Sequence, residues 1–210
     1  MRLKEHSVVL LQGDSITDAG RSRTDDGDLG RGYAGMVAAW VSAAWPERQI
    51  RFINRGISGN RAKDLRARWQ TDCLDLRPSL VSIMIGINDT WRRYDSHDPT
   101  SAEAFEASYR SILEDVRDKL EAEVVLCEPF LLPVPPDRVA WRVDLDPKLA
   151  VVRKLAREFE ATLVPLDGIF AQASTRREPS FWAPDGVHPT PAGHALIAQA
   201  WLRAVVGTLG

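Results

Sequence analysis

Five short apolar runs, separated by longer amphipathic stretches, constrain the fold of this chain more than any other feature of its sequence. The runs are Val8–Leu11, Ile50–Ile53, Leu80–Ile85, Val124–Cys127 and Leu163–Leu166. Their apolar character is continuous rather than alternating, which is typical of strands covered on both faces, as in parallel sheets. We therefore predict five strands in one parallel sheet.

The stretches between these runs have the periodicity of amphipathic helices. Their apolar residues recur at i, i+3, i+4 and i+7, which places them on one face of a helix. The predicted helices are Tyr33–Ala44, Ala62–Leu76, Ala102–Leu120, Pro147–Ala161 and Pro191–Val206. Alternating strands and helices predict right-handed crossovers and a three-layer α/β/α sandwich. Ligands of such sheets bind beyond the carboxyl ends of the strands, so the segments that follow the strands are the candidates for chemistry.

Two segments are predicted to be irregular. One is Gly20–Gly32, and the other is Glu128–Asp146, which contains four prolines. The second is long for a connection inside a compact domain, and loops of this length often act as lids or binding loops.

Length and charge exclude several classes of protein. A hydrophobic share of 44% in 210 residues suffices for one sizeable core, because domains usually contain about 100–200 residues, so we expect a single domain over residues 1–210. Basic and acidic residues nearly balance, at 27 and 29, so neither nucleic acid nor an anionic membrane is an expected partner. No apolar run reaches the ~18 residues of a membrane span, and the first run is too short for a signal peptide. We expect a cytoplasmic protein.

Metal and disulfide signals are weak. The two cysteines, Cys73 and Cys127, lie far apart, and neither a C-x-x-C motif nor zinc-ligand spacing occurs, so we expect two reduced, partly buried thiols. A metal site would have to be built from one histidine and scattered aspartates, namely Asp14, Asp18, Asp185 and His188. Because these residues lack a ligand spacing, we expect neither a metal nor another cofactor.

The first predicted strand is followed by the residues G-D-S-I-T-D, with Ser15 as the serine. A serine directly after a buried parallel strand lies at the carboxyl edge of the sheet. A helix or turn that follows it would aim backbone N–H groups at that point and favour developing negative charge. The same residue types also form ordinary turns and helix caps, so this segment alone does not establish a nucleophile.

The second and third predicted strands are followed by possible hydrogen-bond donors to an oxyanion. The segment N-R-G-I-S-G-N contains Gly59, whose N–H could face the site, and G-I-N-D contains Asn88, whose uncharged amide suits a tetrahedral oxyanion. Taken alone, each segment is better explained as a turn, with Asn60 capping the next helix and Asn88 forming an Asx-turn or cap.

The segment W-A-P-D-G-V-H-P, just before the last predicted helix, contains Asp185 and His188. A serine nucleophile needs an imidazole as general base and a carboxylate that fixes the tautomer of the ring. Asp185 and His188 are close enough on one loop to form this pair, and Gly186 allows the loop to fold back. An exposed histidine in a surface turn remains the alternative.

The four segments together are more specific than any one of them. In this order they resemble the four sequence blocks of the SGNH hydrolases, also called GDSL esterases, and the resemblance covers residues 13–188. It implies a flavodoxin-like fold and a serine esterase without a cofactor. The implied catalytic triad is Ser15, Asp185 and His188, and the implied oxyanion donors are the N–H groups of Ser15 and Gly59 and the side chain of Asn88.

Three longer stretches, N-R-G-I-S-G-N, S-I-M-I-G-I-N-D-T-W-R and D-G-V-H-P-T-P-A-G-H, are similar to those of intracellular acetylxylan and xylo-oligosaccharide esterases of this family. The similarity implies removal of acetyl groups from short sugars by a homo-oligomer. The candidate substrate-binding residues near the expected site are Asp14, Trp91, Arg92 and Trp182. Aromatic rings beside polar groups suit sugar rings, although these residues could equally pack loops or a subunit contact.

Two other functions fit the same motifs. The first is another esterase of the family, such as an arylesterase, a thioesterase or a lysophospholipase, and the apolar residues of Glu128–Asp146 could line a channel for a longer acyl chain. The second is a non-catalytic carbohydrate-binding protein on the same fold.

Overall fold

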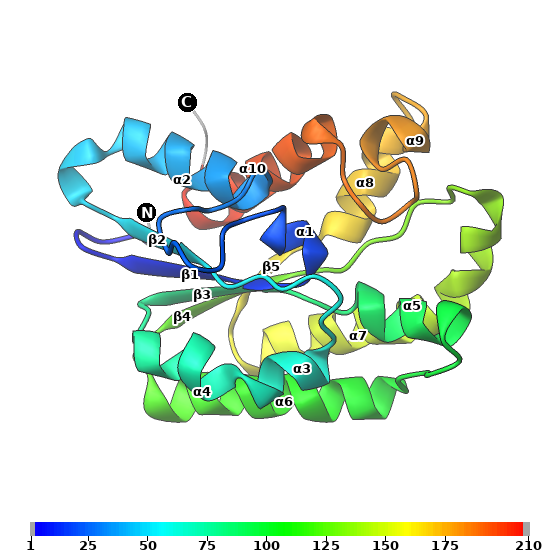
Figure 1. Cartoon of the computed structure of the whole chain (residues 1–210), viewed down its shortest axis with the longest axis horizontal. Coiled ribbons are helices and arrows are strands. Elements are labelled where there is room, and N and C mark those ends of the chain that lie inside the picture. The colour runs from blue at the N-terminus through cyan, green and yellow to red at the C-terminus, as the bar shows by residue number, and fades with distance from the viewer. Residues whose placement is uncertain (1–2, 208–210) are drawn as a thin grey trace.

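Five parallel strands form one sheet in the computed structural model, which describes residues 3–207 (Figure 1). The strands are β1 (Val8–Gly13), β2 (Arg51–Asn54), β3 (Leu80–Met84), β4 (Glu123–Cys127) and β5 (Thr162–Val164). All five predicted strands are therefore confirmed, with shifted ends. The fifth run was expected to continue to Leu166. The strand ends before Pro165 instead, because proline has no N–H to donate to a neighbouring strand, and Leu166 begins a helix.

The strand order β2-β1-β3-β4-β5 is the flavodoxin-like order, in which the chain changes direction across the sheet next to β1. Strand β1 pairs with β2 on one side and with β3 on the other. In this register Gly13 lies opposite Met84, and Leu11 lies opposite Asn54. The segments that follow β1, β2 and β3 consequently emerge side by side at one edge of the sheet.

Helices cover both faces of the sheet and complete the predicted three-layer sandwich (Figure 1). One face carries α2 (Tyr33–Ala44), α8 (Leu166–Ser174) and α10 (Pro191–Val205). The other carries α3 (Ala62–Ala67), α4 (Trp69–Asp72), α6 (Ala102–Lys119) and α7 (Arg142–Glu158). The short elements are α1 (Ser15–Asp18), α5 (Ile87–Asp95), α9 (Pro179–Trp182), and the 3₁₀ turns η1 (Pro46–Arg48), η2 (Leu74–Leu76) and η3 (Pro136–Trp141). No helix within residues 3–207 is long and apolar enough to cross a membrane.

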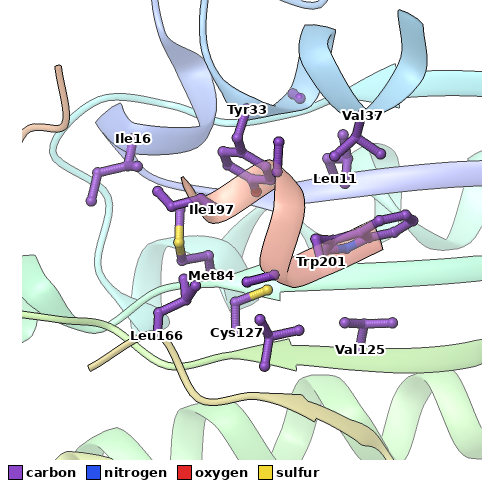
Figure 2. Close-up of a cluster of buried hydrophobic side chains, with 14 of the residues drawn as sticks. Leu11, Ile16, Tyr33, Val37, Met84, Val125, Cys127, Leu166, Ile197 and Trp201 are labelled. Carbon is purple, nitrogen blue, oxygen red and sulfur yellow. The ribbon is translucent and has the colours of Figure 1, made fainter. Parts of the chain in front are cut away.

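The core between the sheet and α10 is centred on Trp201, which is fully buried. Figure 2 shows its ring between the helix and the strand residues Leu11 and Val125. The indole Nε1 donates to Ser82 Oγ on β3 at 2.9 Å, so the single polar atom of this large side chain is paired. This packing fixes α10, and with it the loop that precedes α10, relative to the strands.

Two expectations about secondary structure were wrong in part. The predicted helix Ala62–Leu76 is divided into α3, α4 and η2. The break falls at Arg68, whose N–H bonds to Leu65 O in a tighter turn, while its guanidinium reaches Gln12 Oε1 at 3.0 Å and Gly13 O at 3.4 Å. Contacts with the sheet edge therefore override the local periodicity.

The segment Glu128–Asp146 was expected to be irregular throughout, but its second half is helical. Residues 136–141 form η3, and α7 begins at Arg142 rather than at Pro147. Pro147 cannot bond to the carbonyl of Val143, yet Val143 lies on the exposed side of the helix, where water can solvate that carbonyl. The helices α5, α8 and α9 were not predicted, whereas Gly20–Gly32 contains neither helix nor strand, as expected.

Candidate active site

Ser15 is the first residue of α1 and lies at the carboxyl end of β1. The turn between them requires Gly13, because a Cβ there would lie 2.3 Å from Thr17 Oγ1 and 2.5 Å from Met84 O. Asp14 is buried and caps α1, since its Oδ1 accepts the N–H of Ile16 at 3.0 Å. We expected Asp14 to contact substrate. In the structure its side chain instead caps a helix inside the protein.

The side chains of Ser15, His188 and Asp185 form a continuous chain of hydrogen bonds. Ser15 Oγ lies 3.0 Å from His188 Nε2, and His188 Nδ1 lies 2.6 Å from Asp185 Oδ2. The other carboxylate oxygen of Asp185 accepts the N–H groups of Val187 and His188 at 3.0 and 2.7 Å. With the Nδ1 proton donated to Asp185, Nε2 is left to accept the proton of Ser15.

Gly186 fastens this loop to the segment that follows β4. Its φ is +82°, and a Cβ there would lie 2.5 Å from the carbonyl oxygens of both Leu132 and Val134. The N–H of Leu132 donates to Gly186 O at 2.9 Å. Because L side chains rarely adopt this conformation, glycine is required at the point where the loop folds back.

The electrostatics of the site favour an ionised carboxylate beside a basic imidazole. Burial alone would raise the pKa of Asp185, but the hydrogen bonds from His188 and from two backbone N–H groups lower it to about 2. The bond to Asp185 raises the pKa of His188 above its ordinary value, and burial opposes this change. Burial raises the pKa of Asp14 to about 7 against the bond from Ile16. An imidazolium formed at His188 is therefore stabilised by a carboxylate that stays charged near neutral pH.

Gly59 and Asn88 lie on two segments that are bonded to each other. Asn88 Nδ2 donates to Asn60 O at 3.1 Å, and Asp89 Oδ2 accepts the N–H of Ala62 at 3.1 Å. Gly59 has a φ of +82° and is exposed, with open space around the position of a Cβ. An amide nitrogen has two protons, so Asn88 keeps one N–H for a further acceptor.

The remaining substrate-binding candidates lie in different places. The Trp91 ring packs against the His188 ring, with 5.7 Å between the ring centroids. Arg92 forms an ion pair with Asp95 and reaches Asn88 Oδ1 at 3.4 Å. Trp182 lies in a groove between α8 and α10. Trp91 and Arg92 therefore adjoin residues of the candidate site, whereas the groove of Trp182 is formed by helices that cover one face of the sheet.

Sequence reasoning missed Arg138 as a residue of this region. Its guanidinium lies over the rings of Trp141 and Trp91, and its Nε donates to Asp185 O at 3.4 Å. No local pattern could have revealed it, because η3 meets the Asp185 loop only through the tertiary fold.

Other groups considered in the sequence have structural surroundings. His194 Nδ1 accepts the N–H of Tyr33 at 3.2 Å, and burial lowers its pKa to about 4. Cys73 and Cys127 are free and buried. Within the part of the chain that is described, no group of three or more His, Cys, Asp or Glu side chains is arranged to hold a metal ion.

Comparison with known proteins identifies the family of this chain. The GDSL-like lipase/acylhydrolase family matches residues 11–196. An acetylxylan esterase of Geobacillus stearothermophilus is 36% identical over 213 residues, which are 98% of this chain and 96% of the relative.

Solved structures lead to the same family. The crystal structure of the Geobacillus acetylxylan esterase matches 98% of this chain and 96% of its own with a TM-score of 0.90. An α/β hydrolase from the metagenome of Lake Arreo, Spain, is 33% identical and matches 99% of this chain and 98% of its own with a TM-score of 0.91. The chain belongs to the GDSL-like lipase/acylhydrolase family and is a carboxylic ester hydrolase.

Proposed function

We propose that this protein is a serine esterase that removes acetyl groups from acetylated xylo-oligosaccharides or similar short sugars. The observation that carries the proposal is the hydrogen-bonded chain from Ser15 through His188 to Asp185, with separations of 3.0 and 2.6 Å. The similarity to an acetylxylan esterase over nearly the full length of both chains supports the substrate class.

The proposed reaction begins when His188 Nε2 takes the proton of Ser15 as Oγ attacks the ester carbonyl carbon. The new C–O bond gives a tetrahedral oxyanion, which accepts hydrogen bonds from the N–H groups of Ser15 and Gly59 and from Asn88 Nδ2. The bond to the alcohol then breaks, and His188 donates its proton to that leaving group. Water, activated in turn by His188, attacks the acyl group on Ser15 and releases the acid and free enzyme.

The surroundings of His188 support a sugar as the alcohol part of the ester. Trp91 provides an aromatic surface next to the imidazole, and indole rings suit the apolar faces of sugar rings. The alternatives are an arylesterase, a thioesterase or a lysophospholipase, which would favour other leaving groups or longer acyl chains, and a non-catalytic carbohydrate-binding protein.

Two measurements separate these alternatives. Product analysis on acetylated xylo-oligosaccharides and glucose pentaacetate should show released acetate and defined deacetylated sugars. Rates on acetyl, butyryl and octanoyl nitrophenyl esters should fall with chain length. A preference for octanoyl esters contradicts the acetylesterase proposal, and a protein that binds these sugars without releasing acetate is a binding protein.

We also propose a cytoplasmic homo-oligomer. Two free, buried cysteines suit a reducing compartment. Trp40, Val139, Val143 and Phe181 are large apolar side chains on the surface, and such residues are common in subunit contacts. Light scattering on the purified chain at several concentrations tests the assembly, and a monomer at all of them contradicts it.

A further inference from the structure

Arg138 lies against two indole rings beside the candidate active site, and these rings, those of Trp91 and Trp141, also pack against each other with 5.5 Å between their centroids. Its guanidinium carbon is 3.7 Å from the centroid of the Trp141 ring and 5.1 Å from that of Trp91. Its Nε donates to the backbone oxygen of Asp185 at 3.4 Å, and only 15% of its side chain is exposed. Arg138 belongs to none of the four sequence blocks, so nothing in the motif assigns it a role.

The contacts of Arg138 are part of a longer stack that ends at the catalytic histidine proposed above. Tyr94 stacks on Trp141, with 4.6 Å between centroids and 8° between planes. Trp91 in turn packs against His188 at 5.7 Å. The stack joins three segments far apart in the sequence, because Tyr94 and Trp91 come from α5, Trp141 and Arg138 from η3, and His188 from the loop before α10.

The loop before α10 needs such a support because His188 itself is exposed. On one side this loop is fastened at Gly186, whose backbone oxygen accepts the N–H of Leu132. Arg138 adds an attachment on the adjacent residue, Asp185, and contacts the Trp91 ring, which packs against the imidazole. The planar guanidinium can stack on aromatic faces while it donates in its own plane, and a lysine ammonium lacks this geometry.

We propose that Arg138 is a positioning residue of the esterase. It holds the backbone of Asp185 directly and the imidazole of His188 through Trp91, so that the imidazole keeps the orientation in which it reaches Ser15. This inference rests on the proposed serine-esterase function. Small displacements of a catalytic group slow the chemical step steeply, about 10²-fold for 1 Å, while they leave the binding of a small substrate almost unchanged. Loss of Arg138 should therefore lower kcat and leave KM nearly the same.

The test uses Arg138→Met, which keeps an unbranched apolar side chain against the two indoles but removes the charge and the donor. With nitrophenyl acetate we expect kcat to fall roughly 10–100-fold and KM to change by less than about twofold. The matched control is Arg177→Ala, because Arg177 also lies over an aromatic ring, that of Phe181 at 4.6 Å, but its guanidinium is paired with Glu178 and not with the Asp185 loop. Its kcat should equal that of the wild type.

A proton NMR spectrum gives a second reading that does not depend on turnover. The proton on His188 Nδ1 in the short bond to Asp185 should give a far-downfield resonance in the wild type and in Arg177→Ala. The resonance should broaden or vanish in Arg138→Met, because the loosened pair exchanges its proton with water. A merely structural side chain would leave this resonance in place once the fold is intact.

The outcomes separate this inference from the proposed function. Wild-type kcat and an unchanged resonance in Arg138→Met overturn the role of Arg138, as does an equal loss in Arg177→Ala. If Arg138→Met does not fold, the same criteria apply to Arg138→Lys, which keeps the charge and the length but not the planar fork. Full activity in Ser15→Ala would instead contradict the proposed function, whatever the Arg138 variants do.

Discussion

Ser15 Oγ lies 3.0 Å from Nε2 of His188, although 173 positions separate the two residues in the chain. Two features of the fold produce this contact. Strand β1 delivers Ser15 to the carboxyl edge of the sheet, and α10, held by Trp201 and Ser82 over the same strands, fixes the loop that carries His188. The contact is a product of the topology, and it places an imidazole nitrogen at hydrogen-bond distance from the serine that we propose as the nucleophile.

Loss of the amide of Asn88 should slow acylation. The proposed oxyanion donors are worth about 10²–10³ each in rate, so Asn88→Ala should lower kcat by roughly that factor with acetyl nitrophenyl ester. Stopped assays at saturating substrate give kcat, and circular dichroism before each assay verifies that the variant is folded. A loss below about threefold in a folded variant would remove Asn88 from the proposed oxyanion site.

The pH profile should report His188. The imidazole must be neutral to accept the Ser15 proton, so kcat/KM should rise with pH through an apparent pKa above 6.5, the ordinary value for histidine. Asp185 raises this pKa, so Asp185→Asn should move the rising limb to lower pH and reduce the plateau. A limb that stays in place in Asp185→Asn contradicts the assigned pairing.

Asp14 should make the folded state less stable as the pH rises. Its pKa in the folded protein, about 7, lies above the 3.8 of an unperturbed aspartate, so its favourable contribution is complete below pH 3.8 and is lost as the pH rises through 7. Asp14→Asn keeps an oxygen for the N–H of Ile16 but cannot ionise. The free energy of unfolding of Asp14→Asn, minus that of the wild type, should therefore increase by on the order of a few kcal/mol from pH 4 to pH 8.

Urea unfolding of both proteins at several pH values measures this difference. Asp89 is also buried and its pKa is likewise raised to about 7, so some pH dependence should remain in Asp14→Asn. Parallel curves for the two proteins from pH 4 to pH 8 would show that the pKa of Asp14 is not raised in the folded protein.

Gly186→Ala should both destabilise the protein and disturb the site. A positive φ costs a non-glycine residue about 1–2 kcal/mol, and the clash with Leu132 O and Val134 O adds about 1–3 kcal/mol. Gly20→Ala is the matched control, because Gly20 has a φ of +74° and nothing within 4 Å of its Cβ position. Gly20→Ala should lose only the stability that the positive φ costs, and it should keep its kcat. An equal loss of stability in both variants would disprove the clash at Gly186.

Much of this fold was predictable because buried parallel strands have a plain sequence signal. The continuous apolar runs located all five strands, and the segments after three of them, with the loop before α10, contained the candidate site residues. Periodicity failed where tertiary contacts outweigh it, as at Arg68, whose guanidinium bonds to β1 residues and interrupts the predicted helix. Helix α5 was missed because its core-facing positions include the polar Asn88, Asp89 and Thr90.

The candidate site was predictable in its parts but not in its surroundings. The side chains of Ser15, Asp185 and His188 lie in motifs whose residue types suggest their chemistry. Asp14 looked like a residue that meets substrate, yet it points inward to Ile16, which only the turn geometry reveals. Arg138 could not be predicted, because its role depends on the Trp91 ring of α5 and on the Asp185 carbonyl of the loop before α10, which only the tertiary fold brings to it.

The most direct test of the account is the covalent intermediate. Wild-type protein mixed with nitrophenyl acetate and quenched in acid should carry one acetyl group, and fragmentation by mass spectrometry should place it on Ser15. Folded Ser15→Ala should carry none and should release no nitrophenol above the uncatalysed rate. An acetyl group on another residue, or wild-type turnover by Ser15→Ala, would contradict the account.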